Sequence, residues 1–280
     1  MGRSGRTSAA PLLEFRDDLP RPPFPGAVLR ALILAGGYGT RLAGVARGRS
    51  KVLLPVAGRP VIDYVIDIVS EVPEVGDAVV VTNQRFHTEF VEWAAARRGP
   101  LRMSVLNDGT TGPENRLGAL GDVLFGIERA AIDDDLLIVA GDNLCDFRLS
   151  EMTAVLNDKG SCIALYDVGD VAAASKFNNV GFDDEGRITR FVEKPRNPTS
   201  SLVAVAIYMF RREDLPLFER FAREGNDLDL LGKFIEWAHR RVSIYAHTFR
   251  TNWWDIGDPA VYGAALQHYE TARSADGVVS

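Results

Sequence analysis

The sequence predicts an α/β protein whose mainly parallel sheet is covered by helices on both faces. Its 280 residues, 46% of them hydrophobic and 25% charged, are enough for one domain with a sizeable core. From Val28 onward, short apolar runs rich in β-branched residues alternate with segments of helical spacing. The run Ala31–Leu34 is apolar at every position, which is typical of a strand buried on both faces.

Composition and charge exclude several classes of protein. The net charge of −6 argues against nucleic acid as a partner. No apolar run reaches the roughly 18 residues of a membrane-spanning helix, so we expect no membrane association. Cys145 and Cys162 are the only cysteines, too few for a disulfide framework or a thiolate zinc site. We therefore expect a protein of the reducing cytoplasm.

The first half of the chain contains a tail and then a repeated strand–helix pattern. Residues 1–27 are rich in proline and arginine and are predicted to be a flexible tail, followed by one domain over residues 28–277. The expected strands are residues 31–34, 78–82, 103–106 and 136–140, and the expected helices are residues 59–70, 86–98 and 117–131. This alternation indicates parallel strands joined by crossover helices, although it does not give their order.

The second half, residues 144–277, has a different pattern and predicts a smaller mixed β portion. Its expected strands are residues 161–166, 180–183, 188–193 and 203–210, with a hairpin turn at residues 184–186. Helices are expected at residues 216–223, 228–238 and 259–272. We expect this half to cover the parallel sheet of residues 28–143.

A glycine-rich loop, Ala35-Gly36-Gly37-Tyr38-Gly39-Thr40-Arg41, directly follows the first expected strand. Glycines let the backbone turn sharply and aim several N–H groups at one anion, and Arg41 adds a permanently charged donor set. Two familiar phosphate loops do not fit: a dinucleotide-binding loop would need glycine where Leu42 stands, and no Walker A lysine is present. A simple turn with a surface arginine is the alternative to a phosphate site.

Two aspartates stand where metal ligands are expected. Asp142 ends a buried strand, and Asp255 follows two tryptophans in Asn252-Trp253-Trp254-Asp255. Ligands in open α/β sheets lie beyond the carboxyl ends of the strands, and a divalent ion on a triphosphate needs few protein carboxylates. Taken alone, Asp142 equally fits a turn or a helix cap, and the tryptophans equally fit a core plug.

Two segments together resemble the signature of the sugar-1-phosphate nucleotidyltransferases, also called nucleotide-sugar pyrophosphorylases. The segment 34–42 matches the family pattern G-G-x-G-T-R-L, and the segment 50–60 matches P-K-x-L-L-P-V-x-G-x-P. The chain departs from the usual P-x-T at residues 43–46. The resemblance covers roughly residues 28–270. Within the family, the chain is similar to the glucose-1-phosphate thymidylyl- and uridylyltransferases, and the resemblance implies their Rossmann-like fold.

The resemblance also implies roles for the residues that bind the nucleotide, the metal and the reacting phosphates. It assigns Arg41 to the departing pyrophosphate, Lys51 to charge around the α-phosphate, and Asp142 and Asp255 to Mg²⁺. Lys194 would clamp the phosphate of the sugar. The residues implied to bind the nucleotide are Ala35, Gly36, Gly37, Gly39, Thr40, Asn83 and Gly118.

On the sugar side, the resemblance rests on Phe191-Val192-Glu193-Lys194-Pro195, which matches F-x-E-K-P. It implies that Glu193 binds sugar hydroxyls, with Asn143 and Gly181 as further sugar contacts. Ala206 stands where the family commonly has a glycine, so the shape of this pocket differs from the usual one.

The expected activity is Mg²⁺-dependent transfer of a nucleotidyl group from a nucleoside triphosphate to a sugar 1-phosphate, giving a nucleoside-diphosphate sugar and pyrophosphate. A preference for dTTP or UTP and a hexose 1-phosphate is expected, with the pyrimidine read by backbone groups and Asn83. Guanylyl or adenylyl transfer to a sugar or cyclitol 1-phosphate stays open, because the loop 107–118 is longer than expected for pyrimidine enzymes. A catalytically silent nucleotide-binding regulatory homologue also stays open as an alternative. A homo-oligomer is compatible with the resemblance.

Overall fold

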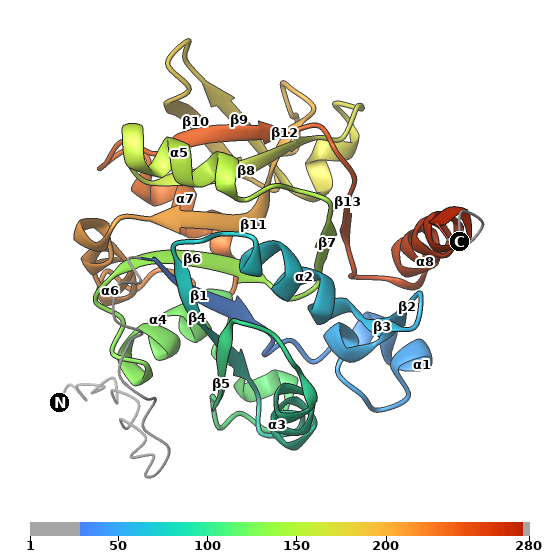
Figure 1. Cartoon of the computed structure of the whole chain (residues 1–280). Helices are drawn as coiled ribbons and strands as arrows, with labels where there is room; N and C mark the ends of the chain where they lie inside the picture. Colours follow the sequence, from blue (N-terminus) through green and yellow to red (C-terminus); the bar gives the residue numbers. More distant parts are fainter. Residues whose placement is uncertain (1–28, 277–280) are drawn as a thin grey trace, which may run out of the picture.

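A seven-stranded sheet forms the centre of the protein. The structure, a computed structural model, describes residues 29–276, so the expectation for residues 1–27 lies outside the described residues. Figure 1 shows the sheet edge to edge. The strand order is β12 (Tyr245–Phe249), β8 (Cys162–Asp167), β11 (Leu202–Phe210), β6 (Asp135–Ala140), β1 (Leu29–Leu34), β4 (Val75–Thr82) and β5 (Arg102–Asn107). All neighbouring pairs are parallel except the two that β11 makes, which confirms a mainly parallel sheet.

Alternate residues of β1 contribute to two cores, one on each face of the sheet. Ala31 and Ile33 pack in the core that contains α2 (Val61–Ser70), α3 (His87–Ala96) and α5 (Ser150–Asp158). Leu32 and Leu34 pack in the other core, with α4 (Ala119–Arg129), α6 (Pro216–Arg223) and α7 (Leu231–Ala238). Every residue of β1 is buried, because helices cover both faces. The predicted fold class is confirmed.

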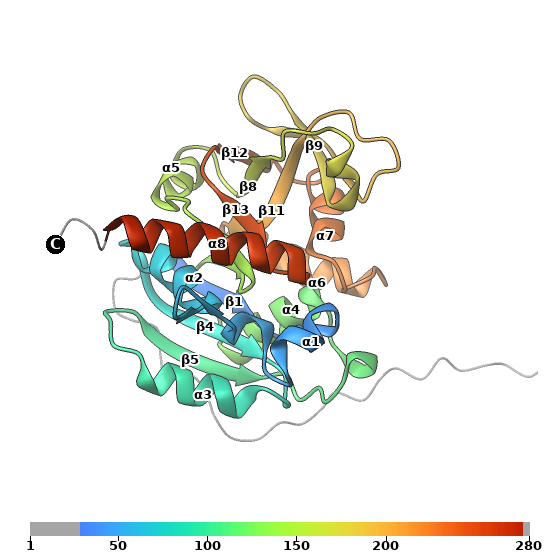
Figure 2. The same ribbon diagram turned by 90° about the vertical axis from the view of Figure 1, so that its right-hand side faces the viewer.

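Smaller ladders and short helices accompany the central sheet. The ladders pair β9 (Asn178–Phe182) with β10 (Ile188–Glu193), β7 (Asn143–Cys145) with β13 (Trp253–Asp255), and β2 (Pro55–Val56) with β3 (Arg59–Pro60). The short helices are α1 (Ala43–Ala46), η1 (Thr40–Leu42), η2 (Lys51–Leu53), η3 (Pro113–Asn115), η4 (Ala173–Lys176) and η5 (Arg212–Asp214). Figure 2 shows α8 (Pro259–Asp276) crossing the front of the molecule, with α5, β9 and β12 above it and α2, β4 and β5 below it. Within the described residues, no helix has both the length and the apolar character of a membrane span.

Several elements differ from the sequence-based expectation. The strands β7, β12 and β13 and the helix α5 were not predicted. The helices α4 and α7 also start later than expected: α4 begins at Ala119 because Gly118 has φ +81°, and α7 begins at Leu231. The carbonyls of Leu228 and Asp229 instead accept hydrogen bonds from the amides of Leu120 and Ala119. A tertiary contact between two loops therefore sets both helix starts.

We expect Phe234→Ala to lower the free energy of unfolding by about 3–5 kcal/mol, because a cavity would replace a fully buried ring. Phe234 is 0% exposed and contacts the rings of Phe210, Phe218, Phe221 and Trp237. Urea unfolding measures the change. The matched control is Phe182→Ala, since Phe182 is 40% exposed and should cost about 0.5 kcal/mol or less. Equal losses in the two variants would contradict the described core.

Candidate active site

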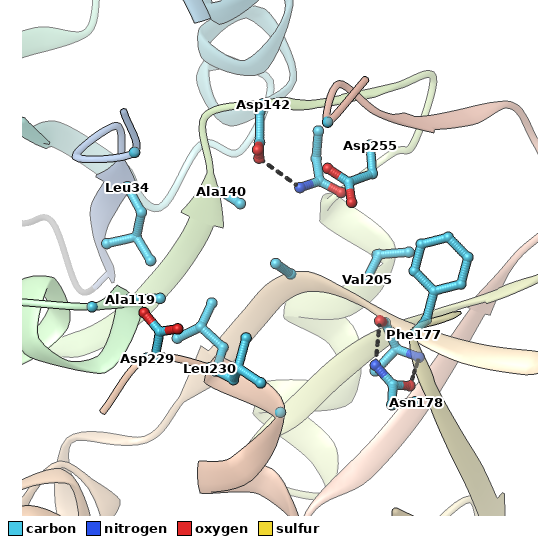
Figure 3. A pocket seen from close by; sticks show the side chains of 18 of the residues that line it. Leu34, Ala119, Ala140, Asp142, Phe177, Asn178, Val205, Asp229, Leu230 and Asp255 are labelled. Carbon is cyan, nitrogen blue, oxygen red and sulfur yellow. Dashed lines mark hydrogen bonds between the residues drawn. The ribbon is translucent and has the colours of Figure 1, made fainter. Parts of the chain in front are cut away.

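A cavity of about 800 Å³ lies beyond the carboxyl ends of the parallel strands. Figure 3 shows it from close by, with Asp142 and Asp255 on one side and Asp229 and Leu230 on the other. The residues predicted from sequence that line it are Ala35, Gly36, Gly37, Arg41, Lys51, Gly118, Asp142, Asn143, Glu193, Lys194 and Asp255. Gly39, Thr40, Asn83 and Gly181 are not among its lining residues.

The glycine loop leaves β1 and turns along the cavity. Gly36 is tightly enclosed, since a Cβ there would overlap Asp122 Oδ2. Gly39 has φ +61°, in the left-handed region that glycine favours, and it begins the short helix that carries Arg41. The Arg41 guanidinium lies against Gly257, where a Cβ would be 3.1 Å from Nη2. The loop thus joins β1 to the turn that holds Asp255.

Asn83 supports the glycine loop from behind. Its Nδ2 donates to the Gly36 carbonyl at 2.9 Å, and its Oδ1 accepts from the Phe86 amide at 3.1 Å. Asn83 is 0% exposed and lies outside the cavity lining. The structure therefore does not place this side chain where it could read a nucleobase, contrary to our expectation.

Tyr38, which the sequence analysis did not select, ties the glycine loop to the loop after β5. Its hydroxyl donates to Thr110 Oγ1 at 2.9 Å. The Thr110 hydroxyl and amide in turn donate to Asp108 Oδ1 at 2.7 and 2.6 Å. Asp108 lines the cavity, so this chain of hydrogen bonds fixes one wall relative to the other. No local sequence signal marks it, because its members come from separate loops.

The ladder between β7 and β13 brings the two predicted metal ligands together. Asp255 pairs with Asn143 in register, and the Ile256 amide donates to the Asp142 carbonyl at 2.9 Å. Asp142 and Asp255 therefore stand side by side at the cavity, as Figure 3 shows. Burial and the neighbouring Asp142 raise the pKa of Asp255 to about 6.

Lys51 forms an ion pair with Asp142 through Nζ and Oδ2. Burial opposes the charge of Lys51, but its ion pair with Asp142 outweighs burial and raises the pKa of Lys51. The side chains are only 16% and 18% exposed, so water screens the pair little. Lys51 therefore stays cationic and is held at the cavity wall.

The donor set fits a divalent cation that also binds phosphate. Within residues 29–276 no group of three or more His, Cys, Asp or Glu is gathered into a metal site. Two carboxylates suffice when phosphate oxygens and water complete an octahedron around Mg²⁺. The mutual repulsion of Asp142 and Asp255, seen in the raised pKa of Asp255, is what a cation between them would relieve.

The side-chain amides of Asn143 and Asn178, which both line the cavity, are already hydrogen-bonded within the protein. Asn143 Oδ1 accepts from Trp253 Nε1 at 2.5 Å, and its Nδ2 donates to Asp142 Oδ1 at 3.2 Å. Asn178 exchanges hydrogen bonds of 2.6 and 3.0 Å with the backbone of Ala204 (Figure 3). Gly181 pairs with Arg190 inside the β9–β10 ladder and is outside the cavity lining. On this strand it is Asn178, not Gly181, that reaches the cavity.

Glu193 is the last residue of β10 and Lys194 follows it, and both line the cavity. Glu193 lies against the start of α7, where a Cβ at Gly232 would overlap its carboxyl group. Burial raises the pKa of Glu193 to about 7. Lys194 has φ +47°, an unusual conformation for a residue with a side chain, and its amide donates to the Phe177 carbonyl at 2.8 Å. Backbone strain of this kind is concentrated at functional sites.

The comparisons with known proteins give the class of this protein. Residues 30–272 match the model of the nucleotidyl transferase family, and the chain belongs to that family. It is 28% identical over 235 residues to a putative mannose-1-phosphate guanyltransferase of Sulfolobus acidocaldarius, covering 84% of this chain and 61% of the relative. It is 30% identical over 254 residues to a glucose-1-phosphate adenylyltransferase of Thermomicrobium roseum, covering 84% and 58%. The chain thus spans about three fifths of the length of these curated relatives.

Solved structures share the fold. A putative glucose-1-phosphate thymidylyltransferase from Bacillus anthracis superposes with a TM-score of 0.70 at 19% identity, covering 86% of this chain and 95% of that one. A UDP-glucose pyrophosphorylase from Acinetobacter baumanii gives a TM-score of 0.71 at 21% identity, covering 86% and 93%. The Rossmann-like fold implied by the sequence resemblance is confirmed.

We expect Glu193→Gln to change the pH dependence of stability. Because the pKa of Glu193 in the folded protein is about 7, against 4.5 as the ordinary value, the unfolded chain loses this proton first as pH rises. The wild type therefore loses stability between about pH 4.5 and 7, and the glutamine variant does not. The melting temperature of the variant relative to wild type should be higher at pH 8 than at pH 5.

Thermal melts at these two pH values and constant ionic strength make this measurement. Glu185→Gln, at an exposed position in the β9–β10 turn, is the control and should show no such difference. If the Glu193→Gln offset is the same at both pH values, the buried carboxyl group does not titrate in this range.

Proposed function

We propose that this protein catalyses Mg²⁺-dependent nucleotidyl transfer from a nucleoside triphosphate to a sugar 1-phosphate. The products are a nucleoside-diphosphate sugar and pyrophosphate. The observation that carries the proposal is that one cavity gathers the glycine loop with Arg41, the Lys51–Asp142 ion pair with Asp255, and Glu193 with Lys194. Family membership and the names of the relatives support the same reaction.

The reaction is an in-line displacement at the α-phosphorus. An oxygen of the sugar phosphate attacks and forms the new O–P bond, while the bond to the pyrophosphate oxygen breaks on the opposite side. The electron pair of the broken bond leaves with pyrophosphate. The attacking phosphate is already ionised, so no strong general base is needed, and catalysis consists of positioning and charge stabilisation.

The cationic groups of the cavity supply that stabilisation. Backbone amides of Gly36 and Gly37 face the triphosphate, with Gly39 and Thr40 shaping the end of the loop. Arg41 binds the leaving pyrophosphate, and Lys51 is placed at the α-phosphate by its ion pair with Asp142. Bound Mg²⁺, held by Asp142 and Asp255, would neutralise phosphate charge. Lys194 orients the phosphate of the sugar.

The sugar side favours a ring with apolar faces and a hydroxyl edge. Tyr166, Phe177 and Trp253 line this end. The ring centroids of Tyr166 and Phe177 lie 5.5 and 5.4 Å from that of Trp253. The Glu193 carboxyl group offers an acceptor for sugar hydroxyls, and the Asn143 amide, which uses one of its two N–H groups for Asp142, offers a donor. A hexose 1-phosphate fits this arrangement, and a cyclitol 1-phosphate shares the same chemistry. We place the reaction in the cytoplasm, a setting that suits the two free cysteines.

A catalytically silent homologue is the second candidate. It would bind nucleotide without turnover and would not need the charged groups of the reaction. Here Arg41, Lys51, Asp142, Asp255 and Lys194 are all at the cavity. Their joint presence favours the enzyme.

We expect Asp142→Asn and Lys194→Ala each to lower turnover about 10²–10³-fold, because each removes a charge that stabilises the transition state. Pyrophosphate release with MgCl₂, over a matrix of nucleoside triphosphates and sugar 1-phosphates, is the assay. Asp133→Asn is the control, since Asp133 pairs with Arg212 at an exposed position far from the cavity. Full turnover by Asp142→Asn would remove this residue from the proposed site, and no product with any pair would favour the silent homologue.

Removal of divalent ions is expected to abolish pyrophosphate release, and added MgCl₂ should restore it, because two carboxylates and a polyphosphate need a shared cation. The measurement is the same assay after treatment with EDTA. Activity that persists in EDTA would show that Lys51 and Arg41 suffice without a metal.

A further inference from the structure

An ion pair at the edge of the cavity joins the two halves of the chain. Arg116 lies in the loop before α4, and Asp229 lies 113 residues later in the loop before α7. Both line the cavity, and their side chains are 50% and 42% exposed. The guanidinium donates from Nε to Asp229 Oδ1 at 2.8 Å and from Nη2 to Oδ2 at 2.9 Å. Two parallel bonds of this kind fix the orientation of the partners as well as their distance.

The backbone next to this ion pair makes the same connection. The Ala119 amide donates to the Asp229 carbonyl at 3.3 Å, and Figure 3 shows these two residues side by side. The Leu120 amide donates to the Leu228 carbonyl at 2.8 Å. Gly118 is so close that a Cβ there would be 2.6 Å from the Leu228 carbonyl oxygen. The start of α4 is therefore held against the segment that leads into α7.

Each side of this connection carries a residue expected to bind a different substrate. On the α4 side, Gly118 lines the cavity and is expected to bind the nucleotide. On the α7 side, Gly232 lines the cavity and lies against Glu193, which is expected to bind the sugar. The bonds from Arg116, together with the charge of Lys194, lower the pKa of Asp229, so Lys194 lies within electrostatic reach of the ion pair. The pair thus stands between the two expected substrate positions.

The geometry of this ion pair matters more for the reaction than for stability. An exposed pair adds little to the free energy of unfolding, because water screens the charges and ordering two long side chains costs entropy. An in-line displacement, by contrast, requires the attacking oxygen and the α-phosphorus to be held in contact and in alignment. A misplacement of about 1 Å can cost about 10²-fold in rate.

We propose that Arg116 and Asp229 are positioning residues that set the distance and alignment between the nucleoside triphosphate and the sugar 1-phosphate. The pair holds the nucleotide side of the cavity, at the start of α4, against the sugar side, at the start of α7. The two side chains act through Gly118 and Gly232 and do not contact the reacting atoms. The inference rests on the proposed function.

Steady-state kinetics of Arg116→Ala and Asp229→Ala test the proposal. Each variant should lower kcat about tenfold or more and leave both KM values within about threefold of wild type, because each substrate keeps its own contacts and only their alignment is lost. The assay is pyrophosphate release in MgCl₂ with the substrate pair that wild type uses best. Melting temperatures close to that of wild type are expected. A raised KM for one substrate with an unchanged kcat would mean that the pair binds that substrate directly, and would overturn the proposal.

The variant that carries both alanines assigns the effect to the contact. If Arg116 and Asp229 act only through each other, the double variant should be no slower than the slower single variant, within about twofold. Losses that multiply would contradict a shared role. Asp133→Ala is the matched control, because Asp133 accepts two bonds of 2.8 and 2.6 Å from Arg212 at an exposed position outside the cavity lining. It should keep the wild-type kcat.

The failure of this inference is distinguishable from failure of the proposed function. If wild type releases pyrophosphate and the single variants keep its kcat, the transferase remains and the positioning role falls. If wild type releases no pyrophosphate with any substrate pair, both fall.

Discussion

The short ladder between β7 and β13 is the contact on which the site depends. It joins Asn143, just after the central strand β6, to Asp255, which the chain reaches only after passing through the whole second half. Without it Asp142 and Asp255 would not face one cavity, and Arg41 would lose Gly257 as its neighbour. The same ladder directs the chain into α8, whose residues Val261, Ala265 and Tyr269 pack in the cluster that also contains Leu42 and Val56. One pairing of six residues thus holds the glycine loop, the metal ligands and the last helix together.

Charge compensation explains why these groups stay where they are. Asp142 is paired with Lys51, and Asp255 is left with a raised pKa because the neighbouring carboxylate and burial both oppose its ionisation. A site that binds phosphate and a cation is expected to contain charges that are not compensated while these ligands are absent. Asp108 and Asp122 show the same imbalance at the other end of the cavity, where no arginine or lysine is paired with them in the described part of the chain. Asp255 is the uncompensated group that stands where we propose that the cation binds.

The glycine loop gains its rigidity from residues outside its own sequence. Asn83 bonds to the Gly36 carbonyl, and Tyr38 reaches Thr110 and through it Asp108. The loop that would bind phosphate is thereby joined to the loop that follows β5. A change in the loop after β5 is therefore expected to affect phosphate binding as well.

The sequence by itself determined the fold class, the positions of the first-half strands and most of the predicted residues that line the cavity. Short apolar runs such as Ala31–Leu34 favour strands buried on both faces, and the glycines with Arg41 and Lys51 carry local patterns that are specific enough to interpret. The starts of α4 and α7, by contrast, were decided by hydrogen bonds between residues 119–120 and 228–229. The positions of Asn83, Gly181 and Tyr38 relative to the cavity were also decided only by the tertiary structure. In each case the deciding partner is distant in the chain, and short-range periodicity contains no information about which distant groups will meet in the folded protein.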